Sequence, residues 1–344
     1  MKRLSLIFKA PFEVGLAEQD LPGIGEKEVL VKTKFSAISH GTEMLLYRGL
    51  FPDGLVVDET ISDLRRPLRY PLKYGYAAVG KVIEAGAGVS KDLVGRTVFC
   101  LHPHESCFAT GVDEILPIPK DIHPRDALFL ANMETAVNFL MDGRPIIGEK
   151  VVVLGQGVVG LLTAALLAKF PLAALLTFDN FTRRREASLS IGAHLALDPA
   201  APEDLQKAIE HLEPGSSEGT ADLVYELSGN PAAINTAIDV AGFDGRIVIG
   251  SWLGKQRAAL ELGGRFHRQR IRLISSQVST VTPALSARWS KHRRFGVAWS
   301  MIRRIRPARF ITHQIPFLQV KEAFELIEKN PASTIQVVLE YDPR

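Results

Sequence analysis

The sequence predicts an α/β protein with two domains, a β-rich first domain and a second domain built on a doubly wound parallel sheet. Its 344 residues are more than one ordinary hydrophobic core holds. The first 120 residues carry short strand patterns separated by Gly and Pro, whereas strand and helix patterns alternate from residue 150 onward. We therefore expect the β-rich domain at 1–122 and about 286–344, and the parallel-sheet domain at 123–285.

Short apolar runs predict the strands of the β-rich domain: "RLSLIF" (3–8), "VLVKTKFSAI" (29–38), "AAVGKVIEAG" (77–86) and "RTVFCL" (96–101). A helix is expected over 125–143, where apolar residues recur at spacings of three and four up to Gly143. The run "TIQVVLEY" (334–341) predicts a last strand that returns to the first domain.

Six buried strands are expected in the second domain, at 150–154, 174–178, 194–197, 222–227, 245–250 and 271–276. Helical patterns lie between most of them, at 159–169, 182–191, 203–212 and 231–241. This alternation is typical of a parallel sheet covered on both faces, with right-handed crossovers.

The cellular compartment is indicated by composition and by the N-terminus. The two cysteines, Cys100 and Cys107, are too few for a disulfide framework and favour a reducing compartment. The apolar run at the N-terminus is too short for a signal peptide. A polar glycine turn interrupts the longest apolar stretch, 151–168, which argues against a membrane span. We expect a cytoplasmic protein with no membrane partner.

Positive charge is concentrated near the C-terminus, where thirteen Lys and Arg and no acidic residue lie between Glu261 and Glu322. The spacing of Trp289, Val297 and Met301 predicts one apolar helix face with arginines on the others. That pattern favours a structural role, or an interface in a homodimer, over nucleic-acid binding. Attraction of an anionic small-molecule substrate remains an open alternative.

A dinucleotide-binding loop is predicted by G-x-G-x-x-G between a buried strand and an apolar helix. The first glycine permits the tight turn, the second lets backbone approach a pyrophosphate, and the third lets helix and strand pack closely. The candidate contacts are Gly155, Gln156, Gly157, Val158, Val159 and Gly160. A glycine-rich turn without a ligand is the alternative.

An acidic residue closes the next strand at the position expected for a ribose-binding carboxylate. This residue, Asp179, is followed by Asn180, and we include both among the cofactor contacts. A carboxylate repels a 2′-phosphate, so NAD(H) is favoured. The arginines at 183–185 leave NADP(H) open, because an arginine there accepts that phosphate in other proteins.

Several motifs together resemble the medium-chain dehydrogenase/reductase superfamily over nearly the whole chain. They are "HGTE" (40–43), "YPLKYGYAAVGKVIEAGAGV" (70–89), "VGRTVF" (94–99), "META" (133–136), the glycine loop and "LVYELSGNP" (223–231). "ISHGTE" and the "GQG" loop resemble the branch around bacteriochlorophyllide a dehydrogenase. The resemblance implies a GroES-like catalytic domain and a Rossmann cofactor domain. It also implies further cofactor contacts at Thr135, Ser228, Gly250, Ser251, Ser275, Ser276 and Gln277.

Zinc members of that superfamily have ligands at positions that read here His40, Tyr76 and about Ala131 or Asn132. Ala77 replaces the glutamate of their G-H-E motif. Because Tyr and Ala do not replace zinc ligands, we expect no catalytic zinc.

The four-cysteine lobe of the zinc members has only Cys100 and Cys107 here, so we expect no structural zinc either. "CLHPHESC" (100–107) has a spacing outside the common zinc patterns and is read as a strand connection. A weak site improvised by His40 with Glu43 or Glu134 stays open.

Without a metal, hydrogen-bond donors must stabilise alkoxide charge. The candidate catalytic residues are His40, Thr42 and Tyr76, which stand at or beside the former ligand positions. The resemblance implies that Thr42 passes the substrate proton, and His40 titrates near neutrality. Each also has a purely structural alternative: Thr42 as a helix cap, Tyr76 as a filler of the lost zinc site, and His40 as a turn histidine.

The function expected from these features is an NAD(P)-dependent oxidoreductase that interconverts an alcohol and a carbonyl by hydride transfer without zinc. A C=C reductase of the enoyl or quinone type is one alternative. A non-catalytic dinucleotide-binding protein is the other.

Overall fold

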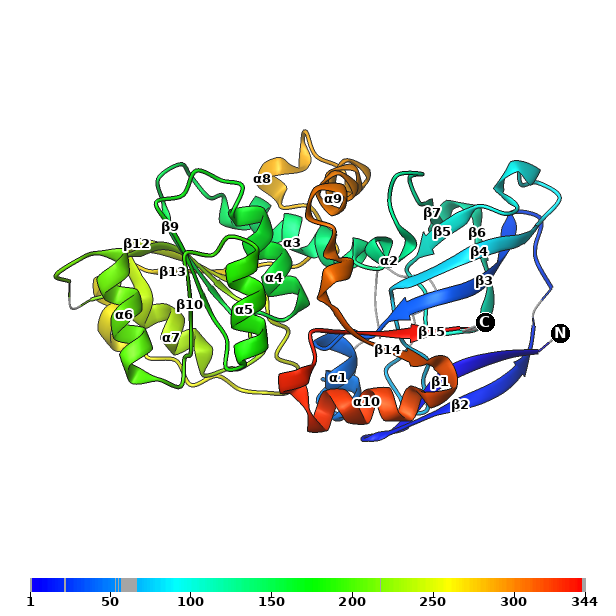
Figure 1. The fold of residues 1–344 in the computed structure, drawn as a ribbon, viewed down its shortest axis with the longest axis horizontal. Coiled ribbons are helices and arrows are strands. Elements are labelled where there is room, and N and C mark those ends of the chain that lie inside the picture. Colours follow the sequence, from blue (N-terminus) through cyan, green and yellow to red (C-terminus); the bar gives the residue numbers. More distant parts are fainter. Residues whose placement is uncertain are drawn as a thin grey trace. The chain divides into compact units, whose positions relative to one another are not determined.

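The computed structural model describes residues 2–21, 23–52, 54, 56, 67–216 and 218–341. The chain divides into two compact units (Figure 1): unit 1 comprises Met1–Ala131 and Ile302–Arg344, and unit 2 comprises Asn132–Met301. Both divisions fall inside helices, α3 (Leu130–Gly143) and α9 (Lys291–Ile305), rather than after residues 122 and 285. A continuous helix has no Gly or Pro at the division, so local sequence carries no signal of it.

The described part of unit 1 contains an antiparallel hairpin and a mixed sheet, in which the pair of C-terminal strands is parallel and the other pairs are antiparallel. A hairpin pairs β1 (Lys2–Ala10) with β2 (Glu13–Asp20). Among the described residues, a seven-stranded sheet has the order β14-β15-β3-β4-β5-β7, with β6 paired to β3. Its strands are β3 (Glu28–Ala37), β4 (Ala78–Ala85), β5 (Thr97–Cys100), β6 (Cys107–Gly111), β7 (Ile115–Pro117), β14 (Ile311–Pro316) and β15 (Gln336–Glu340). The last strand pairs antiparallel with β3, which confirms its predicted return to the first domain.

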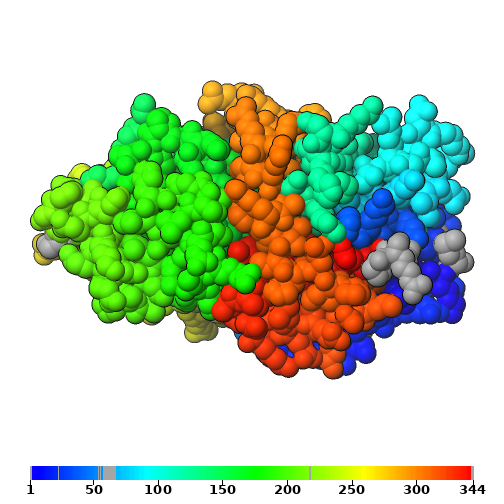
Figure 2. Space-filling view, in the orientation of Figure 1, coloured from blue at the N-terminus to red at the C-terminus, as the bar shows by residue number. Residues whose placement is uncertain are grey.

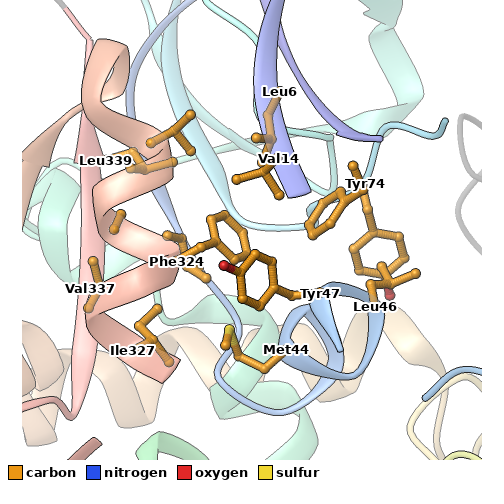
Figure 3. Close-up of a cluster of buried hydrophobic side chains, with 14 of the residues drawn as sticks. Leu6, Val14, Met44, Leu46, Tyr47, Tyr74, Phe324, Ile327, Val337 and Leu339 are labelled. Atoms are coloured by element: carbon orange, nitrogen blue, oxygen red, sulfur yellow. The ribbon is translucent and has the colours of Figure 1, made fainter. Parts of the chain in front are cut away.

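The core of unit 1 joins segments that are far apart in sequence (Figure 3). Met44, Leu46 and Tyr47 of helix α1 (Thr42–Tyr47) pack with Phe324 and Ile327 of helix α10 (Val320–Lys329), and with residues of β1, β2 and β15. The rings of Tyr47 and Phe324 lie 5.4 Å apart. Burial of these large apolar side chains fixes α1, and α1 begins inside the "SHGTE" segment.

Unit 2 is a doubly wound parallel sheet, as predicted. In its described part, six strands have the order β10-β9-β8-β11-β12-β13. They are β8 (Lys150–Leu154), β9 (Ala174–Phe178), β10 (Leu195–Leu197), β11 (Ala221–Glu226), β12 (Ala241–Ile249) and β13 (Arg272–Ser275). Numbered within the unit, this is the 3-2-1-4-5-6 order of the Rossmann fold. Strand order reverses between β8 and β11, where such sheets bind ligands.

Alternate residues of β8 enter different cores, which explains why its sequence is apolar from Val151 to Leu154. Val151 and Val153 belong to one core cluster, and Val152 and Leu154 belong to another. The covering helices are α3, α4 (Val158–Leu167), α5 (Thr182–Ser190), α6 (Pro202–Leu212) and α7 (Ala233–Val240). The last four begin and end within a few residues of the predicted ranges.

Some elements differ from the prediction. The helix expected over 125–143 is divided into α2 (Pro124–Ala127) and α3. Strands β2, β6, β7 and β14 were not expected, because their sequences are short or largely polar and lack a clear apolar alternation. Between β13 and α9, the chain forms the short helix α8 (Pro283–Ser286). No helix in the described ranges has the length and apolar character needed to cross a membrane.

The prediction of which face of α9 is buried is wrong. Trp289 precedes the helix, and Val297 and Met301 are only half-buried. The buried face instead carries Arg294, Ala298, Ile302 and Ile305. A face with an arginine at its start does not appear in a search for apolar periodicity. On the other side of α9, Arg303 and Arg304 are exposed, and the orange stretch that includes this helix reaches the surface in Figure 2.

Candidate functional site

The glycine loop between β8 and α4 has the geometry of a phosphate-binding turn. Gly155 has φ +87°, and a Cβ there would lie 2.5 Å from the Cα of Ser228. A Cβ at Gly160 would lie 1.9 Å from the carbonyl oxygen of Gly155. At Gly157, the residue before α4, a Cβ would meet nothing within 4 Å. Gly155 and Gly160 therefore allow close packing, and Gly157 leaves the first N–H groups of α4 open to an anion.

Asp179 joins the loops that follow β8 and β9. Its Oδ2 accepts a hydrogen bond from the backbone N–H of Gln156 at 2.7 Å, and its Oδ1 accepts one from Phe181 N–H at 2.9 Å. Gln156 is fully buried, and its amide donates to the carbonyls of Val153 and Gly155. Both candidates thus shape the glycine turn. The neighbouring candidate Asn180 is exposed.

The arginines at 183–185 have different environments. Arg184 lies over the ring of Phe181, and its Nη1 is 3.8 Å from Oδ2 of Asp179. Burial lowers the pKa of Arg184. Arg185 donates to the carbonyl of Asp179 and to Oδ2 of Asp198. Two of the three arginines are therefore engaged by acidic or carbonyl groups around Asp179.

Loops after β11, β12 and β13 are connected by hydrogen bonds at the carboxyl edge of the sheet. Oε1 of Glu226 accepts from the N–H of Ser228 at 2.8 Å. Oγ of Ser251 accepts from Gly229 N–H at 2.8 Å, and Ser276 N–H donates to the carbonyl of Ile249. The predicted contacts Ser228, Ser251 and Ser276 therefore lie on the same edge as the glycine loop, because all six strands are parallel.

Three of the other candidates in unit 2, Val158, Val159 and Gly250, have packing roles in this structure. Val158 is buried and Val159 is packed against a core cluster. A Cβ at Gly250 would lie 2.4 Å from the ring of Phe139, so this position requires glycine. Two further candidates, Ser275 and Gln277, are exposed. Thr135 lies in α3 and is half-buried.

In unit 1, the "SHGTE" segment is organised around Ser39, which the sequence analysis did not single out. The Tyr76 hydroxyl donates to Oγ of Ser39 at 2.6 Å. The backbone N–H of Thr42 donates to the same Oγ at 3.2 Å. Thr42 is the first residue of α1 and Gly41 is its N-cap, so the capping role considered for Thr42 is wrong. The three candidate catalytic residues are half-buried. His40 follows Ser39 in the chain, and Thr42 and Tyr76 are hydrogen-bonded to its Oγ.

A fully buried pair of side chains, Glu43 and His104, holds the "SHGTE" segment in place. Oε1 of Glu43 accepts from Ser39 N–H at 2.9 Å, and Oε2 lies 2.8 Å from Nε2 of His104. The other ring nitrogen of His104 lies 2.7 Å from Oγ of Ser36. Gly75 has φ +135°, and a Cβ there would lie 2.8 Å from the His104 ring. Glu43 therefore holds both the backbone of Ser39 and a histidine brought in by the 100–107 loop.

The 100–107 loop is a strand connection with two separate His–Glu pairs. His102 stacks on Phe108 with ring centroids 3.6 Å apart, and its Nε2 lies 3.1 Å from Oε2 of Glu105. Burial raises the pKa of Glu105, but hydrogen bonds and charges from His102 and Lys73 outweigh it and hold that pKa at about 2. Both cysteines are buried thiols.

The donor set does not fit zinc. Tyr76 donates its hydroxyl to Ser39, and Ala131 has no ligating atom. Glu43 is engaged by Ser39 and His104, and Oε1 of Glu134 accepts from Arg294. Within the described ranges, no three His, Cys, Asp or Glu side chains lie together so that they could hold a metal ion.

The sequence analysis also missed a buried polar network in unit 2. Glu134, Asn138 and Asp142 lie at intervals of four along α3, so they share one face of that helix. Arg294 of α9 lies against this face and is fully buried. The spacing of the three polar residues was a usable signal, but nothing in the sequence pointed to Arg294 as their partner.

Comparisons with known proteins agree with this fold. A zinc-binding dehydrogenase family model matches residues 158–293. The D-guloside 3-dehydrogenase of Escherichia coli (strain K12) is 24% identical over 86% of this chain and 87% of that protein. The L-threonine 3-dehydrogenase of Bacillus subtilis (strain 168) is 25% identical over 95% of each. An alcohol dehydrogenase of E. coli CFT073, solved with NADH, superposes with TM-score 0.78 at 19% identity, covering 98% of this chain and 99% of that chain.

The fold and the glycine loop are typical of a dinucleotide-binding domain, and the dehydrogenase relatives identify an oxidoreductase. The match of residues 158–293 to a zinc-binding dehydrogenase family model, together with relatives that are dehydrogenases, supports the resemblance to the medium-chain dehydrogenase/reductase superfamily drawn from the motifs. The family model matches a part of unit 2 that begins just after Gly157, and it does not reach residues 40 and 76, where the resemblance puts zinc ligands. The narrower placement near bacteriochlorophyllide a dehydrogenase stays a prediction.

Proposed function

We propose that this protein interconverts an alcohol and a carbonyl with NAD(H) as the preferred cofactor and without zinc. The observation that carries the proposal is the Tyr76–Ser39 hydroxyl pair, in which Tyr76 stands at a position where the resemblance puts a zinc ligand and Ser39 precedes another such position, His40. The relatives named D-guloside 3-dehydrogenase and L-threonine 3-dehydrogenase support a hydroxyl group as the site of oxidation.

Unit 2 supplies the cofactor-binding residues in this proposal. The N–H groups at the start of α4 receive the pyrophosphate, and Gly157 provides the space. Asp179 receives the ribose hydroxyls, and its charge disfavours a 2′-phosphate. When bound, the nicotinamide accepts or supplies the hydride.

Ser39 is the proposed hydrogen-bond donor to the substrate oxygen. Its Oγ accepts two hydrogen bonds, from the Tyr76 hydroxyl and from Thr42 N–H. A serine oxygen has two acceptor lone pairs, so both are used, and its own hydrogen is left to donate. Donation from Tyr76 also makes the Ser39 hydroxyl a stronger donor. Such a donor stabilises the negative charge that develops on an alkoxide oxygen.

Thr42 and His40 complete the proposed proton path. Thr42 adjoins Ser39 through its backbone N–H, and the family resemblance gives it the task of passing the proton. His40 follows Ser39 directly in the chain, and its imidazole is able to accept and donate a proton. Glu43 and His104 lie beneath and hold the segment in place.

The test combines metal analysis with cofactor titration on the purified protein. Zinc is quantified by mass spectrometry, NADH and NADPH are titrated by fluorescence, and a panel of alcohols is assayed with and without a chelator. We expect NADH to bind more tightly than NADPH, and activity to survive the chelator. Stoichiometric zinc whose removal abolishes activity would contradict the zinc-free proposal.

A further inference from the structure

Arg294 is a fully buried charge whose hydrogen-bond donors are all engaged. Nε and Nη2 donate to Oε1 of Glu134 at 3.0 and 2.8 Å. Nη1 donates to Oδ1 of Asn138 at 2.5 Å and to the carbonyl of Thr280 at 3.0 Å, and Nη2 also donates to the carbonyl of Val278. Five donors in a planar fork are used, which a lysine cannot reproduce.

The network continues from Asn138 to the end of β13. The Asn138 amide donates to Oδ2 of Asp142 at 2.9 Å and to Oγ of Ser276 at 3.1 Å. The Ser276 hydroxyl donates to Oδ2 of Asp142 at 2.5 Å. Three attachments, at Ser276, Val278 and Thr280, therefore connect the segment 276–280 to α3 and α9.

This segment lies at the ligand-binding edge of the Rossmann sheet. It follows β13 directly, and Ser276 N–H is bonded to Ile249 at the end of β12. The glycine loop follows β8 on the same edge, where doubly wound sheets bind dinucleotides. Residues 276–280 form no helix or strand, so the conformation of this segment depends on its hydrogen bonds to α3, α9 and β12.

Stability alone does not account for this arrangement. A buried ion pair costs much desolvation energy, and apolar side chains of similar volume commonly serve a core as well or better. Two of the five donors of Arg294 go to backbone carbonyls of the segment, where an apolar replacement would leave no attachment. The guanidinium of Arg294 thus fixes the backbone of Val278 and Thr280 by hydrogen bonds to their carbonyls.

We propose that Arg294 is a positioning residue that holds segment 276–280 in the conformation that receives the cofactor. This inference rests on the proposed dehydrogenase function. Arg294 acts through the segment and through Glu134 and Asn138, and makes no contact of its own with cofactor.

The test separates positioning from folding by a paired substitution. Arg294→Met alone leaves the Glu134 carboxylate buried without its partner and is expected to lower Tm. In Arg294→Met/Glu134→Leu the lone charge is gone, so Tm is expected to return toward the wild-type value while the backbone attachments stay lost. Arg293→Met is the matched control, since Arg293 is the adjacent exposed residue of the same helix and lies over Trp289.

The readouts are NADH affinity by fluorescence titration and amide hydrogen exchange of residues 276–280. For the double variant we expect an NADH Kd about tenfold weaker, and faster exchange confined to that segment. Arg294→Lys is expected to bind NADH as weakly as the double variant, and Arg293→Met as tightly as wild type. Wild-type affinity and exchange in the double variant would overturn the inference. Failure of the wild-type protein to bind either NADH or NADPH would instead overturn the proposed function.

Discussion

In the proposed mechanism, the hydroxyl pair of Ser39 and Tyr76 stabilises the charge that zinc would otherwise stabilise. The structure gives Ser39 two hydrogen bonds to accept, which leaves its own hydrogen to donate to a third group. Their contribution depends on the fixed direction of the two O–H bonds. Fixed dipoles of this kind stabilise developing charge without reorganisation during the reaction.

Removal of either hydroxyl is therefore expected to slow catalysis rather than cofactor binding. For Ser39→Ala and Tyr76→Phe we expect kcat to fall about 100-fold, with NADH affinity unchanged, because one donor to the oxyanion or its support is lost. Steady-state kinetics with an alcohol that the wild-type protein oxidises measures the first, and fluorescence titration the second.

Tyr70→Phe is the matched control for these substitutions. The Tyr70 hydroxyl donates to the carbonyl of Leu46, away from Ser39, so its loss is expected to leave kcat near the wild-type value. Undiminished kcat in Ser39→Ala would show that the proton path does not pass through this hydroxyl.

The lowered pKa of Glu105 leads us to expect that the stability of the protein falls at acidic pH. Its pKa is held at about 2, below the ordinary value of 4.5, by His102 and Lys73 against the opposing effect of burial. A pKa that is lower in the folded state means that the unfolded chain binds the proton more readily. The stabilisation is therefore fully present above pH 4.5 and is lost as the pH falls from 4.5 toward 2. Its size is roughly 3 kcal/mol by linkage.

Urea unfolding at a series of pH values measures this effect. Glu105→Gln is expected to be less stable than wild type at pH 7, with a difference that shrinks below pH 4.5. Asp121→Asn is the control, since its ion pair with Arg303 is exposed and contributes little. A pH-independent difference for Glu105→Gln would contradict the assignment.

At the scale of elements, two glycines of the loop meet different requirements: close packing of the turn at Gly160 and space for a ligand at Gly157. Gly160 packs against Gly155, and a Cβ there would overlap its carbonyl oxygen. Gly157 has open space around it and a φ that any residue adopts. One glycine is needed for the turn itself, and the other for the ligand.

Alanine at these two positions is expected to have different effects. Gly160→Ala should lower both Tm and NADH affinity, because the turn must move to relieve the overlap. In Gly157→Ala we expect an unchanged Tm and about tenfold weaker NADH binding, because the methyl group occupies space for the pyrophosphate. Thermal unfolding and fluorescence titration on the same samples measure both. Equal loss of Tm in the two variants would contradict this division.

Elements were predicted well where their information is local. Strands β8 and β9 were predicted to the residue, because each is a short buried run ending at a turn residue. The buried face of α9 was missed, because a charged residue begins it, and its burial depends on Glu134, 160 positions earlier in the chain.

For the whole molecule, the placement of Arg294 in unit 2 yields a prediction about domain limits. A fragment of residues 130–305 contains α3 and α9 entire, with the network between them. We expect it to fold and bind NADH.

The fragment 123–285, cut at the boundaries predicted from sequence, lacks Arg294 and leaves the Glu134 carboxylate without its partner. It is expected to be unstable, since a buried charge without a partner costs several kcal/mol. Circular dichroism and NADH titration compare the two fragments, and equal stability would show that the network is dispensable.

The sequence by itself determined the α/β class, the resemblance to the superfamily, the glycine loop with Asp179, and the candidate residues of "SHGTE". Each depends on spacing within a few tens of residues, because a strand, a turn and a helix start all leave local patterns. The tertiary structure alone decided that Ser39 joins Tyr76, that Glu43 pairs with His104, and that Arg294 holds the segment after β13. A buried polar side chain must find its partner in space, and that partner is chosen by the packing of the chain rather than by its order.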